Sequence, residues 1–150
     1  MAQLALHGGA PVRTDPWPGW PVFDEAEVRA VEEVVRSGQW FAPGGTKVKA
    51  FEARFAEFQN ARYAVAVCNG TLALELGLLA LGVGAGDEVI IPAYTFIATA
   101  TAVLRANAVP VPVDIHPDTW LIDPKAVEAA VTDRTKAVLP VHLSGAPAPE

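Results

Sequence analysis

From residue 63 onward, short apolar runs alternate with segments of helical periodicity, and this alternation leaves few folds open to the chain. The apolar runs predict buried strands at 63–68, 88–92, 109–115 and 136–143. The intervening segments predict helices at 71–81 and 95–106, and a shorter helix begins at Asp123-Pro124, where proline takes the favoured first position. Strands that alternate with helices build βαβ units. The sequence therefore predicts an α/β fold with a mostly parallel sheet flanked by helices.

The residues before this pattern predict an arm followed by two helices. Residues 1–22 contain closely spaced prolines and glycines and two tryptophans, which excludes a helix or a central strand over most of this segment. The first helix is expected over 24–38, because Asp24 begins a capping-box pattern, and the second over 46–60. We therefore predict an arm over 1–22 and a larger α/β domain over 23–150.

Charge and cysteine content exclude several classes of protein. The formal net charge of −6 and the lack of a Lys/Arg-rich run argue against nucleic acid as the main partner. Cys68 is the only cysteine, so no internal disulfide can form, and the His and Cys residues lack metal-ligand spacing. The N-terminus lacks a signal-peptide pattern, and no apolar stretch approaches the roughly 20 residues of a membrane span. We expect a cytoplasmic protein without a metal site or a membrane anchor.

The Asn69-Gly70-Thr71 triplet joins a predicted strand to a predicted helix. Such a junction directs free backbone N–H groups and the positive end of the helix dipole toward one point. Gly70 would let an anion approach the backbone, and the Thr71 hydroxyl could bind a phosphate oxygen. The alternative is purely structural, because Asn-Gly favours turns and Thr favours helix caps. The triplet by itself leaves both interpretations open.

A second junction, Pro92 to Phe96, also follows a strand and precedes a helix. Ligands of open α/β sheets gather at the carboxyl ends of the strands. An aromatic side chain at this position can stack on a flat cofactor ring, although Phe96 alone would more simply be a core residue. The second junction therefore indicates a ligand site only in combination with the Asn69-Gly70-Thr71 junction.

Taken together, these junctions resemble the DegT/StrS group of PLP-dependent sugar aminotransferases. The resemblance runs in unbroken order over roughly residues 20–146 and is carried by segments 68–74, 81–89, 92–99, 113–115, 122–124, 134–137 and 140–143. Segments 37–40 and 44–45 resemble the branch that contains scyllo-inosose aminotransferases and amino-hydroxybenzoate synthases.

The resemblance implies a fold-type I enzyme, a homodimer with shared active sites, and pyridoxal 5′-phosphate (PLP) as cofactor. Gly70, Thr71 and Leu72 correspond to the group that binds the cofactor phosphate, and Phe96 corresponds to the aromatic residue that stacks on its pyridine ring. His142 lies in a segment on the cofactor side of the sheet, where a binding role competes with that of a core histidine.

Three further residues are expected near the substrate or the partner subunit. Gln39 and Trp40 lie in an aromatic, glycine-rich loop that we expect to approach the active site of the partner subunit. Thr95 precedes the predicted stacking residue and is expected to border the substrate.

The implied reaction is transfer of an amino group from glutamine or glutamate to a keto-sugar or keto-cyclitol, in amino-sugar or antibiotic biosynthesis. The lysine that binds PLP covalently falls after residue 150 in the family pattern, so we expect a truncated sequence that contains the N-terminal part of the PLP-binding domain. A PLP-dependent sugar dehydratase and an amino-hydroxybenzoate synthase remain alternatives of the same fold. A non-catalytic α/β dimerisation or regulatory domain is the alternative from another class.

Overall fold

The computed structural model describes residues 3–149, which form two compact units, one ending at Ala64 and the other beginning at Val65. The division into an arm over 1–22 and a domain over 23–150 stays a prediction. The first unit contains a short 3-10 helix, η1 (Ala5–His7), and two α-helices, α1 (Glu25–Ser37) and α2 (Lys47–Phe58).

Helix α1 has the ends that its sequence predicts. The Asp24 side chain accepts the N–H of Ala26, and the Glu27 carboxylate accepts the Asp24 N–H, which completes a capping box. Gly38 follows the helix in the left-handed region at φ 69°, where a glycine has no steric penalty. Local sequence signals alone therefore fix both ends of this helix.

Apolar side chains of the first unit remain exposed in the described chain. Val31 on α1 is 64% exposed, and Phe58 on α2 is 81% exposed. In the arm, the Arg13 guanidinium lies 4.4 Å from the centre of the Trp17 ring, and Trp17 itself is 79% exposed. The two helices and the arm therefore all present large apolar side chains to solvent in the described chain.

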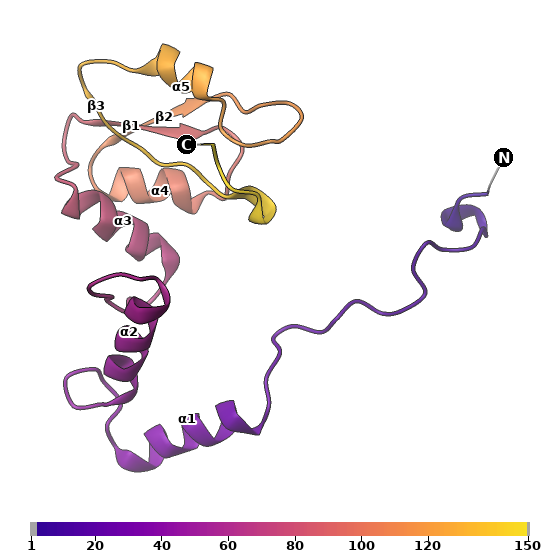
Figure 1. Cartoon of the computed structure of the whole chain (residues 1–150), viewed down its shortest axis with the longest axis vertical. Helices are drawn as coiled ribbons and strands as arrows, with labels where there is room; N and C mark the ends of the chain where they lie inside the picture. Colours follow the sequence, from indigo (N-terminus) through magenta and orange to yellow (C-terminus); the bar gives the residue numbers. More distant parts are fainter. Residues whose placement is uncertain (1–2, 150) are drawn as a thin grey trace. The chain divides into compact units, whose positions relative to one another are not determined.

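The second unit is a three-stranded parallel sheet with helices on both faces (Figure 1), as predicted. The strand order is β2-β1-β3. Helices α3 and α4 cover one face, and α5 covers the other (Figure 1). The elements are α3 (Gly70–Ala80), β1 (Glu88–Pro92), α4 (Ala98–Arg105), β2 (Val109–Val113), α5 (Pro124–Ala130), β3 (Thr135–Val138) and a 3-10 helix, η2 (Leu143–Gly145).

Strand β1 forms the centre of the core, and its residues alternate between the two faces of the sheet. Val89 and Ile91 pack into a cluster with residues of α3 and α4. Ile90 packs into the other cluster, which includes residues of α5. Because every residue of β1 is buried, the strand is a continuous buried run, as expected for a parallel strand covered on both faces.

Pro110 and Pro112 lie within β2, which nevertheless pairs with β1 over its full length. The Val109 N–H donates to the Asp87 carbonyl at 2.8 Å, so the odd-numbered positions of β2 direct their N–H groups toward β1. The two prolines therefore take the positions whose missing N–H would point away from β1.

Residues 63–68 do not form the predicted strand, and this prediction was wrong for the described structure. Tyr63 and Val65 are each 76% exposed, and the segment takes no part in the sheet. A strand exists only through the ladder it forms with a partner, and residues 3–149 supply no partner strand for this segment. The other predicted elements form with shifted ends; for example, the helix expected from residue 95 begins at Ala98.

Within the described part of the chain, no helix is both long and apolar enough to cross a lipid bilayer.

A buried carboxylate links the first residue of β1 to the segment that precedes β3. Glu88 is 5% exposed and accepts hydrogen bonds from the Thr132 hydroxyl at 2.6 Å and from Arg134 Nε at 2.9 Å. The Thr132 hydroxyl, and then Arg134, hold the pKa of Glu88 below its usual value. Because the pKa of Glu88 is lower in the folded state, its carboxylate stabilises the fold at pH values above the pKa that Glu88 has in the unfolded chain. This contribution is lost as the pH falls through the lower, folded-state pKa.

We therefore predict that Glu88→Gln reduces the loss of folding stability that the protein shows when the pH falls from 7 to 4. Urea denaturation of the protein at pH 7 and at pH 4 should show a smaller difference for this variant than for the wild type, with lower stability at pH 7. Glu32→Gln is the control, because Glu32 forms an exposed ion pair with Arg36 on α1 and such pairs contribute little. An unchanged pH profile for Glu88→Gln would contradict the prediction.

Candidate functional site

The N-terminus of α3 is the predicted anion-binding turn. Asn69 is the N-cap in extended conformation, and its Oδ1 accepts the Leu72 N–H at 2.9 Å. No described residue accepts a hydrogen bond from the N–H of Gly70 or Thr71. These two amides lie at the positive end of the helix dipole, so they can bind an anion directly.

The Leu72 amide was also expected to bind phosphate, and here it is engaged by Asn69. A phosphate role for Leu72 would require that bond to be released, so this role stays a prediction. The group available in this conformation consists of the Gly70 and Thr71 amides and the Thr71 hydroxyl.

A hollow of about 310 Å³ lies beside this turn and extends to α4. Arg105 is the cationic residue on its wall, and Arg105 Nε lies 2.5 Å from Glu75 Oε2 on α3. Nothing in the sequence singles out Arg105, because its proximity to the turn depends on how α4 packs against α3. The lining residues are Cys68, Asn69, Thr71, Leu72, Thr101 and Arg105.

The turn after β1 carries the predicted stacking residue. Phe96 is 76% exposed, so it is not a core residue in the described chain. The Thr95 hydroxyl lies 2.8 Å from the Thr99 hydroxyl. Tyr94 contacts Trp120 edge-on, with ring centres 5.7 Å apart, and Trp120 takes the uncommon φ of 61°. Sequence analysis missed Trp120, since its contact with Tyr94 joins the turns that follow two neighbouring strands.

His142 follows β3 and is exposed. Its Nδ1 accepts the N–H of Ala148 at 2.9 Å. A neutral imidazole that accepts at Nδ1 carries its hydrogen on Nε2, so Nε2–H is the group that His142 could offer to a ligand. The carboxyl ends of parallel strands meet at one edge of the sheet, so Phe96 and His142 follow strands that end at the same edge.

Gln39 and Trp40 belong to the first unit, where they line a cavity of about 150 Å³. Trp40 Nε1 donates to the Val35 carbonyl at 3.1 Å, while the ring remains 71% exposed. The N–H groups of Gly44 and Gly45 both donate to the Phe41 carbonyl, at 3.2 and 2.9 Å, which closes the loop with a turn. The loop is therefore well defined by its own contacts.

No group of three or more His, Cys, Asp or Glu side chains is arranged to hold a metal ion among residues 3–149. The features that remain are an anion-binding turn, an exposed aromatic ring and an N–H donor. All three belong to the unit that begins at Val65.

Residues 21–150 match the sequence profile of the DegT/DnrJ/EryC1/StrS aminotransferase family. The chain belongs to this family. The family assignment confirms the resemblance seen in the sequence and, with the solved structures, the fold-type I architecture.

Three relatives show how close the similarity is. The L-glutamine:2-deoxy-scyllo-inosose aminotransferase of Micromonospora echinospora is 46% identical over 151 residues, covering 97% of this chain and 36% of that protein. The crystal structure of 3-amino-5-hydroxybenzoic acid synthase matches with a TM-score of 0.86 and 48% identity, over 91% of this chain and 35% of that one.

The third relative was crystallised with a cofactor. The structure of NtdA from Bacillus subtilis with bound cofactor PMP matches with a TM-score of 0.75 and 44% identity, over 79% of this chain and 27% of that one. The chain thus spans about a third of the length of the aminotransferase and synthase relatives.

Proposed function

We propose that this member of the DegT/DnrJ/EryC1/StrS family supplies part of the PLP site of an aminotransferase that transfers the amino group of glutamine to a keto-cyclitol. The observation that carries the proposal is the pair of unengaged amides at the start of α3, in the same unit as the exposed Phe96 ring. The similarity to a glutamine:scyllo-inosose aminotransferase supports the substrate class.

The residues present fit PLP. A Cβ atom built on Gly70 would meet nothing within 4 Å, so the space over this backbone is open to a phosphate group. The Gly70 and Thr71 amides would hold the phosphate, and the positive end of the helix dipole would stabilise its negative charge. Phe96 would cover one face of the pyridine ring. PMP, the cofactor in the NtdA structure, is the amine form of PLP.

When bound, PLP supplies an electron sink that stabilises negative charge on the carbon next to the transferred nitrogen. The part played by this chain is to bind and orient that group. The α3 N-terminus would hold the phosphate end, Phe96 would limit tilting of the ring and exclude water from one face, and His142 would offer its Nε2–H at the edge of the sheet. Holding and orienting the cofactor in this way involves no proton transfer by residues 3–149.

We also propose that the protein is a homodimer in which the loop of Gln39 and Trp40 approaches the partner subunit's active site. The exposed Trp40 ring and the ordered loop support this proposal, because a large exposed indole usually marks a contact surface. A cytoplasmic location stays a prediction of the sequence.

A second candidate is 3-amino-5-hydroxybenzoate synthesis, favoured by the TM-score of 0.86 to that synthase. The two functions differ in the substrate, and Gly70, Thr71 and Phe96 do not determine which substrate binds. Both candidates therefore predict the same PLP site in this chain.

The test of function uses the full-length gene product loaded with PLP. We expect glutamine to convert the cofactor to its amine form, visible as loss of PLP absorbance, and 2-deoxy-scyllo-inosose to restore the absorbance with release of an amino-cyclitol. If 2-deoxy-scyllo-inosose does not restore the absorbance and the protein instead releases 3-amino-5-hydroxybenzoate, the second candidate is correct. If PLP does not bind, both are wrong.

Phe96→Ala should weaken PLP binding by about 1–2 kcal/mol, roughly 5- to 30-fold, because it removes an aromatic stacking contact. The measurement is the Kd of PLP for the full-length protein by absorbance titration. Phe96→Trp should retain most of the affinity. Ile97→Ala is the matched control, since Ile97 is 70% exposed in the same turn and carries no ring. Equal loss in the Phe96→Ala and Ile97→Ala variants would argue against stacking.

A further inference from the structure

Thr99 is one of the few buried polar residues in the described chain, and it binds the turn of Phe96 at two points. It is 5% exposed. Its hydroxyl lies 2.8 Å from the Thr95 hydroxyl, and its N–H donates to the Phe96 carbonyl at 3.0 Å. One buried residue therefore fixes the side chain just before the ring and the backbone that carries the ring.

The other contacts of this turn show what the Thr95–Thr99 pair adds to it. Ile97, the residue at the N-cap of α4, makes no side-chain cap bond. The Thr95–Thr99 bond spans the same turn and links its two ends through their side chains, although it engages no backbone N–H as a cap would. At its other end the turn is attached to the sheet, because the Ala93 N–H donates to the Val113 carbonyl at 2.8 Å. Residues 93–99 are thus held at both ends.

The Phe96 ring gains little from its own packing. It is 76% exposed, and its ring stacks on none of the other aromatic rings among residues 3–149. An exposed side chain in water samples several rotamers and costs conformational entropy when a ligand fixes it. The backbone therefore sets the Cα–Cβ direction of Phe96, and Thr99 holds that backbone at the Phe96 carbonyl.

We propose that Thr95 and Thr99 are positioning residues that fix the Phe96 turn so that the ring is directed for stacking on PLP before the cofactor arrives. This inference rests on the proposed function. It also gives Thr95 a role beyond the substrate contact expected from the sequence, because the Thr95 hydroxyl bonds to Thr99.

The two roles predict different measurements. A substrate contact at Thr95 would change the KM of the ketone and leave the Kd of PLP unchanged, and Thr99 would be irrelevant to both. A positioning pair would change the Kd of PLP equally for either residue. Valine is the appropriate replacement, because it keeps the shape of threonine and removes only the hydroxyl.

The experiment measures the Kd of PLP for the full-length protein by absorbance titration. We expect Thr95→Val, Thr99→Val and the double variant each to weaken binding by about three- to ten-fold, the range of one lost hydrogen bond. Because both single variants break the same bond, the double variant should be no weaker than either one. Thr95→Ser and Thr99→Ser should bind as the wild type does.

Two controls separate positioning from general destabilisation. Thr132→Val removes a hydroxyl bonded to Glu88 at the opposite edge of the sheet, so it should lower stability and leave the Kd unchanged. In a Phe96→Ala background, Thr95→Val should cause no further loss, because the ring that it positions is gone.

The outcomes separate this inference from the proposed function. A wild-type protein that does not bind PLP overturns both. A wild type that binds PLP, with unchanged affinity in Thr95→Val or Thr99→Val, overturns only the positioning pair. The positioning pair is also overturned if the losses add in the double variant, or if Thr95→Val weakens binding equally with and without Phe96.

Discussion

Replacing Gly70 with alanine should weaken PLP binding by the full-length protein about 10- to 150-fold without reducing its stability. The added methyl group would occupy the space over the Gly70 backbone through which a phosphate reaches the Gly70 and Thr71 amides. Hydrogen bonds to a charged group contribute about 1.5–3 kcal/mol, which sets the expected range. Stability should be retained, because a Cβ at Gly70 meets no atom within 4 Å and alanine is the better helix former.

Gly77 provides the matched control within the same helix. A Cβ at Gly77 also meets nothing within 4 Å, and Gly77 lies two turns beyond the first residue of α3. Gly77→Ala should raise the free energy of unfolding by up to about 1 kcal/mol and leave the Kd of PLP unchanged. Absorbance titration gives the Kd, and urea denaturation gives the stability. If Gly70→Ala binds PLP like the wild type, the phosphate does not lie on these amides.

Features that depend on local sequence signals were predicted well. Asp24 and Gly38 define the ends of α1, and Asp123 followed by Pro124 begins α5, as expected. In each case the residue satisfies a backbone group within its own turn, so no distant contact is needed. The parallel sheet was also predictable, because alternating strands and helices allow few other arrangements.

Features that depend on distant partners were not predictable. Residues 63–68 have the composition of a strand, yet composition cannot supply the neighbouring strand that a ladder needs. The contact of Tyr94 with Trp120 requires the turns after two strands to meet. Arg105 reaches the edge of the phosphate turn only through the packing of α4 on α3. None of these contacts leaves a pattern within one segment of sequence.

In the candidate site, too, some single-atom contacts were predictable from the sequence and others were not. The Asn69-Gly70-Thr71 motif correctly predicts a helix N-terminus with two unengaged amides. It does not reveal that the Asn69 side chain engages the Leu72 amide, since Asn69 could equally have pointed toward a ligand. Likewise, the sequence proposes Thr95 as a substrate contact, whereas the folded turn pairs its hydroxyl with that of Thr99.

The lysines of this chain allow the sharpest test of what the chain contributes to catalysis. We expect that none of Lys47, Lys49, Lys125 and Lys136 forms the covalent bond to PLP. A lysine in that role must be shielded from water and must reach the aldehyde of a ring whose phosphate lies at Thr71. All four side chains are exposed.

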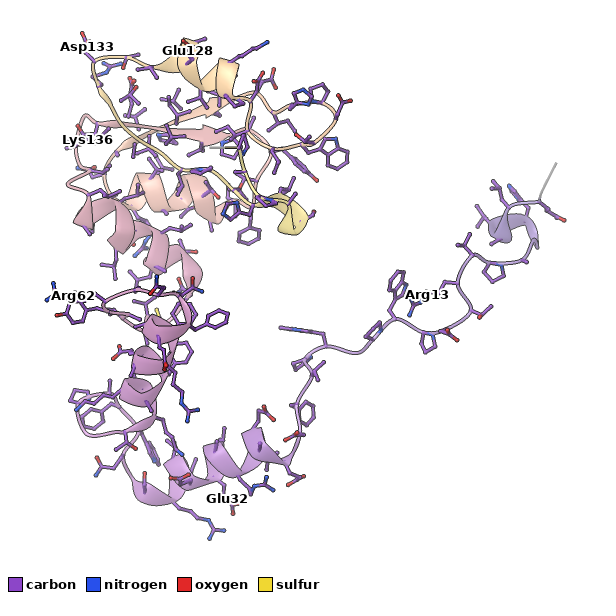
Figure 2. The ribbon with its side chains drawn as sticks, in the orientation of Figure 1. Arg13, Glu32, Arg62, Glu128, Asp133 and Lys136 are labelled. Atoms are coloured by element: carbon purple, nitrogen blue, oxygen red, sulfur yellow. The ribbon has the colours of Figure 1, made fainter. Side chains whose placement is uncertain are left out.

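The positions of these lysines also argue against a covalent bond to PLP. Lys47 Nζ is engaged by Glu33 Oε2 at 2.7 Å. Lys125 is the second residue of α5, which covers the face of the sheet opposite to α3 and α4. Lys136, which is labelled in Figure 2, is the second residue of β3. The first residue of β3 pairs with Glu88 at the start of β1. Lys136 therefore lies near the amino ends of the strands, and ligands of open α/β sheets bind at the carboxyl ends.

The measurement is reduction of the PLP-loaded full-length protein with borohydride, followed by mapping of the modified peptide. Reduction fixes PLP to the lysine that holds it, so one stoichiometric adduct is expected at a lysine outside residues 1–150. The 150-residue chain treated in the same way should give only weak, scattered modification. Because Lys47, Lys49, Lys125 and Lys136 are all open to solvent, chance reaction should label them to similar, low extents. A single stoichiometric adduct at any of the four would mean that this chain contains its own catalytic lysine, and the proposed division of the active site would have to be abandoned.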